Sequence, residues 1–398
     1  MVGSGAVGLG CAYALAKAGR PDILVLERAD EAGAVTTSQG AGLCGQVRDS
    51  VERTKLAMHS VATFRELQRS EVKPDWHEVG SIRIALNDPR VEEFRRLKLA
   101  ADATGLETEF LDHAQARRRW PLMDFESVKS ILWCPSDGHM TPRCVAASYK
   151  HNAEKLGVRF SNATALEEIV VKKGCVAGVK TNRGSADCRY VINAAGANAY
   201  HVAKLAGLEL PIFPVRHEYF VTVPMDGLTP ELPCFRIPEL TLYGRVRDGG
   251  LLLGGWEPKS LHLDPRCFAR DNEPPPVVTD WPVLDSFEAS FTELFPTARA
   301  AQKSWVGKGW PTFTPDGRFI LGESSRIKGF VMAGGCNAHG ISGSGGMGKL
   351  LVESLLDPKP SAYVKSLSPD RFAETSWNWE EARSQAARVY ETYYGTGC

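Results

Sequence analysis

Apolar positions in this chain follow two patterns, which occupy different parts of the sequence. Short, continuous apolar runs bounded by turn residues are typical of strands in a sheet core. Stretches with helical spacing or helix-favouring composition lie between them. Strands are predicted at residues 22–27, 79–86, 158–160, 190–193, 319–321 and 329–333. Helices are predicted at residues 9–18, 51–70, 89–103, 146–156, 281–295 and 349–356.

The pattern changes between residues 211 and 256, where strands follow one another with turn residues between them. These strands are predicted at residues 217–223, 240–247 and 251–256, and a hairpin at 166–181. Residues 257–282, rich in proline and charge, predict a surface loop, and residues 334–348 are a glycine-rich run. Strands alternating with helices, followed by consecutive strands, predict an α/β fold with an α+β second domain.

Composition restricts the function classes. Among 398 residues, 43% are hydrophobic and 24% charged, with 47 basic and 47 acidic side chains, so no net charge favours nucleic acid. No apolar run approaches the roughly 18 residues that span a bilayer. The ten cysteines are scattered without a CxxC pair, which argues against a disulfide framework and a metal site. A reducing compartment, cytoplasm or mitochondrial matrix, is expected.

The first residues carry a dinucleotide-binding fingerprint. Gly3, Gly5 and Gly8, with Ala6 and Val7 between them, precede a helix. Such glycines allow a tight turn and close approach to pyrophosphate, and the helix directs its N-terminal amides at that charge. Glu27, followed by Arg28, ends the next strand 19 residues after Gly8, where an acid binds ribose hydroxyls. The simpler alternative is a glycine-rich turn beside a surface glutamate.

Only Met1 and Val2 precede this fingerprint, which normally follows a complete central strand. A typical strand would have three or four more residues here. Lost ladder partners cost roughly 1–3 kcal/mol each when buried. We therefore expect the natural protein to have upstream residues that complete this strand. We also expect this chain to bind its cofactor weakly and to show no targeting segment.

Several later segments carry a family likeness. They are residues 36–43 (TTSQGAGL), 45–48 (GQVR), 76–81 (WHEVGS), 193–196 (NAAG), 217–219 (HEY), 313–317 (FTPDG) and the glycine run from 334. In this order they resemble the D-amino-acid-oxidase superfamily of FAD-dependent oxidoreductases, above all the flavin domain of dimethylglycine and sarcosine dehydrogenases. Those enzymes continue into a folate-binding half, and residues 388–398 look like the segment where that half begins.

The resemblance implies a Rossmann-like FAD-binding domain interleaved with an antiparallel-sheet substrate domain. The FAD-binding parts would be residues 1–75, 146–208 and 306–365. The substrate parts would be residues 76–145 and 209–305, followed by a C-terminal tail at 366–398. Residues implied to bind FAD are Gly3, Gly5, Ala6, Val7, Gly8, Glu27, Arg28, Thr37, Ser38, Gln39, Gly42, Leu43, Leu166, Ala194, Ala195, Gly196, Gly335, His339, Gly340 and Ile341.

Four residues are candidates for the chemistry. Tyr243 and Arg245 are two apart on one predicted strand and share a face, so the resemblance implies Tyr243 over the flavin and Arg245 on a substrate carboxylate. Arg48 follows a glycine-containing loop, and His339 lies within the glycine run. The simpler alternatives are a surface strand for Tyr243 and Arg245, an ordinary salt bridge for Arg48 and a flexible loop for the glycine run that contains His339. His217 is expected to be a structural hydrogen-bonding residue.

Departures from the family predict how FAD is held. The covalent histidine of the related dehydrogenases is replaced by Gln39, and Gly309 stands near the cysteine that tethers flavin in monomeric sarcosine oxidase. FAD is therefore expected to be non-covalent. Leu252 occupies the place of the lysine that promotes the oxygen reaction in that oxidase, which favours a dehydrogenase.

The predicted function is FAD-dependent oxidation of a secondary or tertiary N-methyl amino acid to an imine. The substrate partner is a small amine. The electron acceptor stays open between an electron-transfer flavoprotein, a quinone and oxygen. One alternative is oxidative deamination of a primary amino acid, as in glycine oxidase or D-amino-acid dehydrogenases. Another is a non-catalytic flavoprotein, similar to the regulatory subunit of pyruvate dehydrogenase phosphatase.

Overall fold

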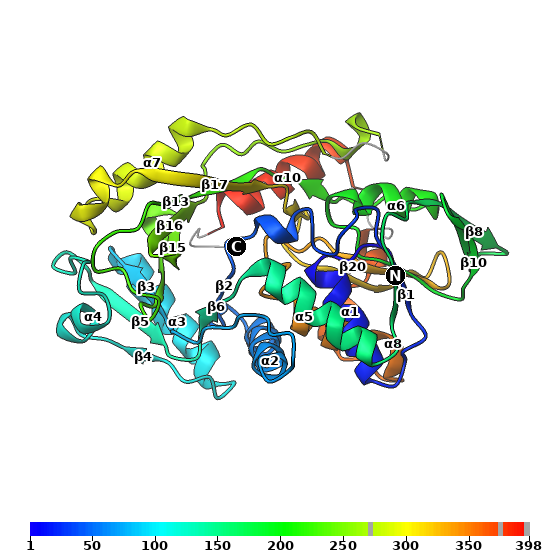
Figure 1. Cartoon of the computed structure of the whole chain (residues 1–398), viewed down its shortest axis with the longest axis horizontal. Coiled ribbons are helices and arrows are strands. Elements are labelled where there is room, and N and C mark those ends of the chain that lie inside the picture. The colour runs from blue at the N-terminus through cyan, green and yellow to red at the C-terminus, as the bar shows by residue number, and fades with distance from the viewer. Residues whose placement is uncertain (270–273, 373–376, 394–398) are drawn as a thin grey trace.

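Two sheets and the helices packed on them make up the fold in a computed structural model (Figure 1), which describes residues 1–269, 274–372 and 377–393. The chain passes between the two sheets several times, so neither is built from one continuous segment. Residues 270–273, within the predicted surface loop, and 373–376 and 394–398, within the predicted tail, lie outside the described residues. Among the described helices, none has the length and apolar character needed to cross a membrane.

The smaller sheet is parallel at its centre and carries the N-terminus. Its strands are β7 (Arg159–Ser161), β1 (Leu24–Leu26), β11 (Val191–Asn193), β20 (Phe330–Gly334) and β19 (Ile320–Glu323). Val2 forms parallel bridges with both Leu26 and Asn193. The Val2 amide donates to Ile192 at 2.8 Å, and the Leu26 amide donates to Met1 at 2.9 Å. The residues before the fingerprint therefore lie at the sheet centre, as predicted.

Helices α1 (Ala6–Lys17) and α8 (Ser344–Leu356) cross on this sheet at very close range, with α5 (Pro142–Lys155) beside α1. A Cβ at Gly10 would lie 2.7 Å from the carbonyl oxygen of Ser344, and one at Gly348 would lie 2.6 Å from that of Gly10. The prediction that this helix begins at residue 349 was wrong: it begins at Ser344. Glycines occupy these helical positions because the neighbouring elements leave no room for side chains.

The larger sheet has eight strands in the order β17-β13-β16-β15-β14-β3-β5-β4 (Figure 1). Only β14 and β3 pair in parallel; the other neighbours are antiparallel, close to the predicted antiparallel sheet. The strands are β17 (Lys303–Gly309), β13 (His217–Thr222), β16 (Gly250–Gly255), β15 (Leu242–Arg247), β14 (Cys234–Ile237), β3 (Ser81–Ala85), β5 (Ser130–Cys134) and β4 (Glu109–Phe110). Strands β14, β17, β5 and β4 were not predicted.

A hydrophobic core supports one face of this sheet. Helix α7 (Trp281–Phe291) packs there, and Phe291 stacks on Phe235 with 5.0 Å between ring centroids. Trp120 contacts Phe235 edge-on at 5.5 Å, and all three rings are fully buried. Full burial of such aromatic side chains contributes roughly 1.5–3 kcal/mol each. The sheet therefore forms a rigid wall for whatever its other face contacts.

The remaining elements connect or cover the two sheets. The remaining strands are β2 (Leu43–Cys44) paired with β6 (Gly138–His139), β12 (Phe213–Pro214) paired with β18 (Thr312–Phe313), and the meander of β8 (Leu166–Lys172), β9 (Cys175–Thr181) and β10 (Gly184–Asp187). The remaining helices are α2 (Val51–Leu67), α3 (Asp88–Asp102), α4 (His113–Arg119), α6 (Ala199–Leu205), α9 (Ala362–Ser366) and α10 (Trp379–Glu391). Helix α10 lies within the tail for which no element was predicted.

We predict that Gly348→Val destabilises the chain, because its side chain would meet the backbone of α1. Overpacking of this kind costs about 1–3 kcal/mol, to be measured by urea unfolding. Gly334→Ala is the control, since its Cβ would have its nearest neighbour at an ordinary 3.7 Å. Equal midpoints for Gly348→Val and the parent chain would contradict the tight crossing.

Candidate functional site

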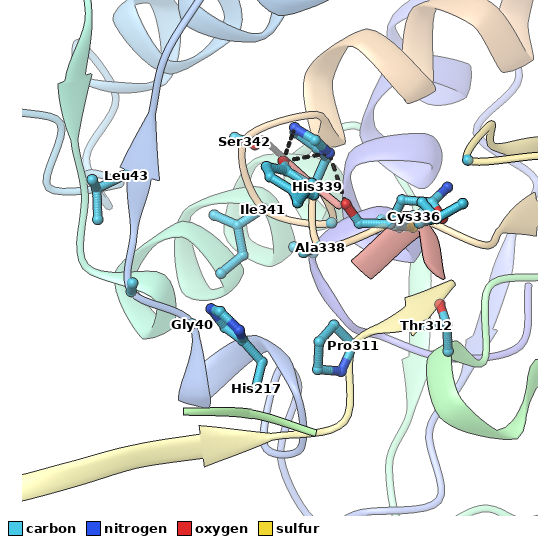
Figure 2. Close-up of a pocket in the computed structure, with 18 of the residues that line it drawn as sticks. Gly40, Leu43, His217, Pro311, Thr312, Cys336, Ala338, His339, Ile341 and Ser342 are labelled. Atoms are coloured by element: carbon cyan, nitrogen blue, oxygen red, sulfur yellow. Dashed lines mark hydrogen bonds between the residues drawn. The ribbon is translucent and has the colours of Figure 1, made fainter. Parts of the chain in front are cut away.

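A cavity of about 900 Å³ lies between the two sheets and receives residues from both. Figure 2 shows part of its wall: Gly40 and Leu43 from the segment after α1, His217 and Pro311 from the larger-sheet side, and the loop carrying Cys336, Ala338, His339, Ile341 and Ser342. The walls thus come from segments far apart in the sequence. Such a concave, partly apolar space with few polar groups is where small molecules bind.

The glycine fingerprint forms one end of the cavity. Gly5, Ala6 and Val7 line it at the start of α1. Gly3 has φ +97°, and a Cβ there would lie 2.6 Å from the carbonyl oxygen of Ala194. A Cβ at Gly8 would lie 2.1 Å from the carbonyl oxygen of Gly3. The turn is therefore possible only with glycine, and it brings the amide-rich, positive end of a helix to the cavity.

Glu27 lies beside this turn at the end of β1, where the fingerprint predicts an acid. Its Oε2 accepts hydrogen bonds from the amide and the hydroxyl of Ser4, both at 2.8 Å, and its Oε1 accepts one from the Ala29 amide at 2.9 Å. Glu27 is only partly buried and does not line the cavity. The carboxylate is thus fixed beside the glycine turn.

At another part of the wall, Tyr243 on β15 and His217 on β13 form a pair. A hydrogen bond of 2.7 Å joins Tyr243 Oη and His217 Nε2. The imidazole stacks on Trp256 with 4.5 Å between ring centroids. Burial lowers the pKa of His217 to about 4, so the ring is neutral at physiological pH. Its pairing with Tyr243 was not predicted, because the two residues are 26 positions apart.

Arg48 lines the cavity four residues after the end of the short strand β2. Its Nη1 donates to the carbonyl oxygen of Val47 at 3.0 Å, and in the described part of the chain it forms no ion pair within 4.0 Å. Burial lowers its pKa, although the guanidinium stays charged. A half-buried cation without an anionic partner favours binding of an anion from solution.

A second arginine reaches the same region from the larger sheet. Arg236 on β14 lines the cavity, and a Cβ at Gly45 would lie 2.8 Å from its Nη1. It was missed because β14 itself was not predicted. His339 Nδ1–H donates to the carbonyl oxygen of Asn337 at 2.8 Å, and its Nε2 accepts from the Tyr393 hydroxyl at 2.7 Å. Burial, followed by the charges of Arg48 and Arg53, holds its pKa well below the usual range.

Arg245 shares the face of Tyr243, but it does not line the cavity. It is buried, its Nε donates to the carbonyl oxygen of Ala41 at 2.9 Å, and its Nη1 donates to that of Val246 at 2.9 Å. The guanidinium thus bonds to the backbone of Ala41, a residue that itself lines the cavity. In this position Arg245 supports the cavity wall, and we do not retain it as the carboxylate anchor.

Comparison with known families identifies the fold. The family model described as "FAD dependent oxidoreductase" matches residues 1–354. The chain belongs to this family. A solved structure similar to it, L-proline dehydrogenase from P. horikoshii, superposes with a TM-score of 0.83 over 94% of this chain and 96% of that one, at 22% identity. The predicted Rossmann-like α/β flavoenzyme fold is thereby confirmed, and the predicted domain boundaries stay predictions.

Two characterised relatives match nearly the whole chain. 4-Methylaminobutanoate oxidase (formaldehyde-forming) from Paenarthrobacter nicotinovorans is 29% identical, over 99% of this chain and 48% of its own length. Mitochondrial dimethylglycine dehydrogenase from Homo sapiens is 27% identical, over 99% of this chain and 46% of its own length. The chain thus spans about half the length of these relatives, and the predicted family likeness is confirmed.

FAD is the cofactor of this family, and the residues present fit it. A Cβ at Gly3 or Gly8 would clash with the backbone of Ala194 or Gly3, so only glycine allows the tight turn that a dinucleotide pyrophosphate requires. Of the residues predicted to bind FAD, those lining the cavity are Gly5, Ala6, Val7, Thr37, Gln39, Gly42, Leu43, Ala194, Gly196, His339, Gly340 and Ile341. Those outside its lining are Gly3, Gly8, Glu27, Arg28, Ser38, Leu166, Ala195 and Gly335. Roles of individual residues in binding FAD stay predictions.

The two positions that the resemblance matches to covalent flavin attachment lie next to one another. Gln39 and Gly309 both line the cavity, and a Cβ at Gly309 would lie 2.3 Å from Gln39 Oε1. The amide of Gln39 thus fills the space beside Gly309. Neither residue offers a nucleophile that forms a covalent bond to a flavin ring.

We therefore predict that acid precipitation of the FAD-loaded chain releases all of its FAD into the supernatant, measured by absorbance of both fractions. A Gln39→His variant is the matched comparison, because it restores the residue type that tethers flavin in the related dehydrogenases. Yellow colour in the pellet of the parent chain would contradict the prediction and identify a different tether.

Proposed function

We propose that this chain oxidises the C–N bond of a secondary or tertiary amino acid, an N-methyl amino acid above all, to an imine. The observation that carries this proposal is the presence of Arg48 and the Tyr243–His217 pair on the wall of one cavity. Arg48 supplies a cation without an ion-pair partner among the described residues, which suits a substrate carboxylate. Tyr243 and His217 supply neutral polar groups that suit the amine of the substrate.

Each side chain has a separate task in this reaction. FAD, when bound, supplies the hydride acceptor. Arg48 holds the carboxylate and so orients the substrate. Tyr243 offers a hydroxyl whose hydrogen bond to His217 fixes its direction. The indole of Trp256, stacked on His217, contributes an apolar wall that limits water around the reacting bond.

The relatives support this substrate class by their names. One acts on 4-methylaminobutanoate and forms formaldehyde, and another acts on dimethylglycine. Both compounds combine an N-methyl amine with a carboxylate, the two groups for which the cavity provides partners. The fully buried Leu252, at the position of the oxygen-promoting lysine of monomeric sarcosine oxidase, leads us to propose a dehydrogenase that passes electrons to an acceptor other than oxygen.

The proposal is tested by anaerobic bleaching of the bound flavin with sarcosine, dimethylglycine, 4-methylaminobutanoate, proline and glycine. We expect bleaching by an N-methyl amino acid, with formaldehyde as product and slow recovery of colour when oxygen is admitted. Bleaching by glycine alone, with release of ammonia, would establish primary amine oxidation instead. No bleaching by any of the five would indicate a non-catalytic flavoprotein.

We predict that Arg48→Met raises the KM for the amino acid about ten- to a hundred-fold more than for its decarboxylated amine, because a charge-assisted hydrogen bond contributes roughly 1.5–3 kcal/mol. Arg95→Met is the control, since Arg95 is exposed, pairs with Glu92 and lies outside the cavity wall. Equal losses for both substrates with Arg48→Met would remove Arg48 as the anchor.

A further inference from the structure

Two arginines of the larger sheet lie in one row with Tyr243 on the cavity wall. Arg236 on β14 is paired with Tyr243 on β15 on one side and with Arg83 on β3 on the other. Directly paired residues project from the same face of a sheet, and neighbouring strands are about 4.8 Å apart. All three side chains line the cavity, as does Arg48. The wall therefore carries a row of two cations that begins beside the hydroxyl of Tyr243.

The loop after β2 brings Arg48 to the same place. The carbonyl oxygen of Val47 accepts hydrogen bonds from Arg48 Nη1 and Arg83 Nη2. Because both nitrogens bond to one oxygen, at 3.0 and 2.9 Å, they lie no more than about 6 Å apart. The guanidinium of Arg236 lies over Gly45, where a Cβ would be 2.8 Å from Nη1 and 3.2 Å from Cζ. Three guanidinium groups thus meet around this loop.

A buried acid fixes the loop against the sheet. Asp137, which is 2% exposed, accepts from the Gln46 amide at 2.7 Å through Oδ1 and from the Ser81 hydroxyl at 2.5 Å through Oδ2. Gln46 belongs to the loop, and Ser81 begins β3. One carboxylate therefore ties the loop that carries Arg48 to the strand that carries Arg83, which holds the two cations at a fixed spacing.

The cavity wall has more cations than acids. Among the described residues that line it, six are arginines and three are acids, a formal excess of three positive charges. The acids are Asp49, Glu93 and Asp316, and they pair with Arg53, Arg90 and Arg371, respectively. The row also places two like charges at directly paired positions of neighbouring strands, an arrangement that destabilises a sheet and that a bound anion relieves.

We propose that Arg83 and Arg236 bind a second carboxylate of the substrate while Arg48 holds the first, so that the preferred substrate is an N-methyl amino dicarboxylic acid. This inference rests on the proposed function, because it names the substrate class of the same site. One guanidinium can bind both oxygens of a carboxylate in a fork, so Arg48 suffices for the first carboxylate. Monocarboxylic N-methyl amino acids then bind more weakly but still react.

The spacing of the arginines fits two carboxylates on one short skeleton. In an extended aspartate or glutamate skeleton the two carboxyl carbons are about 4–5 Å apart. The donors of Arg48 and Arg83 lie within about 6 Å of one another, which suits one carboxylate on each. Arg236 is on the strand between Arg83 and Tyr243, so the Tyr243 end of the row is left for the substrate amine.

The main test compares N-methylglutamate with N-methylglutamine in anaerobic flavin reduction by the FAD-loaded chain. The two compounds are of equal size and differ by one negative charge, so this comparison needs no variant. We expect the half-saturating concentration to be about ten- to a hundred-fold lower for N-methylglutamate, as for the gain of a charge-assisted hydrogen bond. N-methylaspartate and N-methylasparagine form a shorter matched pair. The absence of an advantage for the diacid in both pairs would overturn the second subsite.

Variants then test whether the row provides this preference. Arg236→Met and Arg83→Met should each lower the preference for N-methylglutamate over N-methylglutamine about ten-fold or more. Arg247→Met is the matched control, because Arg247 is a half-buried arginine of the same sheet that stacks on Trp305 and lies outside the cavity lining. An unchanged preference in Arg236→Met and Arg83→Met, or an equal loss in Arg247→Met, would overturn the assignment.

A second measurement does not depend on oxidation. Isothermal titration calorimetry of the FAD-loaded chain compares succinate with butyrate and glutarate with valerate, which are diacids and monoacids of equal chain length. We expect each diacid to bind about ten-fold more tightly, and Arg236→Met to remove the difference. If no amine bleaches the flavin but the diacids keep this advantage, the proposed function fails while the second anion subsite stands. Equal affinities of diacids and monoacids would overturn the subsite even if N-methyl amino acids are oxidised.

Discussion

The crossing of α1 and α8 is the constraint on which the site depends. At Gly10 and Gly348 the two backbones approach so closely that an added Cβ would lie 2.7 Å or less from a carbonyl oxygen. Helix α1 begins at the glycine fingerprint, and α8 begins where the loop carrying His339 ends. The crossing therefore brings the start of the chain and a loop more than 330 residues later to the same cavity. A side chain at either glycine would separate the two walls.

Burial then decides which groups in the cavity carry charge. His217 and His339 both have lowered pKa values, mainly because of burial, and are neutral at physiological pH. Arg48 stays charged, since a guanidinium keeps its proton even when its pKa is lowered. The same environment thus separates charged arginines, Arg48 among them, from two neutral imidazoles. This separation is what a zwitterionic substrate requires, because its carboxylate needs a positive partner whereas its amine must lose a proton.

The sequence predicted those parts of the fold that depend on local pattern. The fingerprint, the helix after it, the acid at Glu27 and the strand ending at Asn193 follow from glycine spacing and short apolar runs, and the structure has them at those places. Strand β14 was missed because a four-residue strand has a weak pattern of its own, whereas helix α10 was missed although its buried residues Ala382, Ala386 and Tyr390 recur at helical spacing. With β14, Arg236 was missed as a residue of the cavity wall. The position of Arg245 depended on the path of the backbone around Ala41, which no local pattern reveals.

The non-covalent FAD that we predict from Gln39 and Gly309 has a consequence for how the two halves of the fold are held together. A covalent flavin would stay in place through any separation of the sheets, whereas a non-covalent one is held only while both walls contact it. The fingerprint wall belongs to the smaller sheet, and Tyr243 and His217 belong to the larger one. A ligand that binds only the folded state stabilises it in proportion to the logarithm of its concentration relative to Kd. If FAD is held without a covalent bond, as we predict, it would act both as a cofactor and as a connection between the sheets, and the affinity for FAD and the stability of the fold would then vary together.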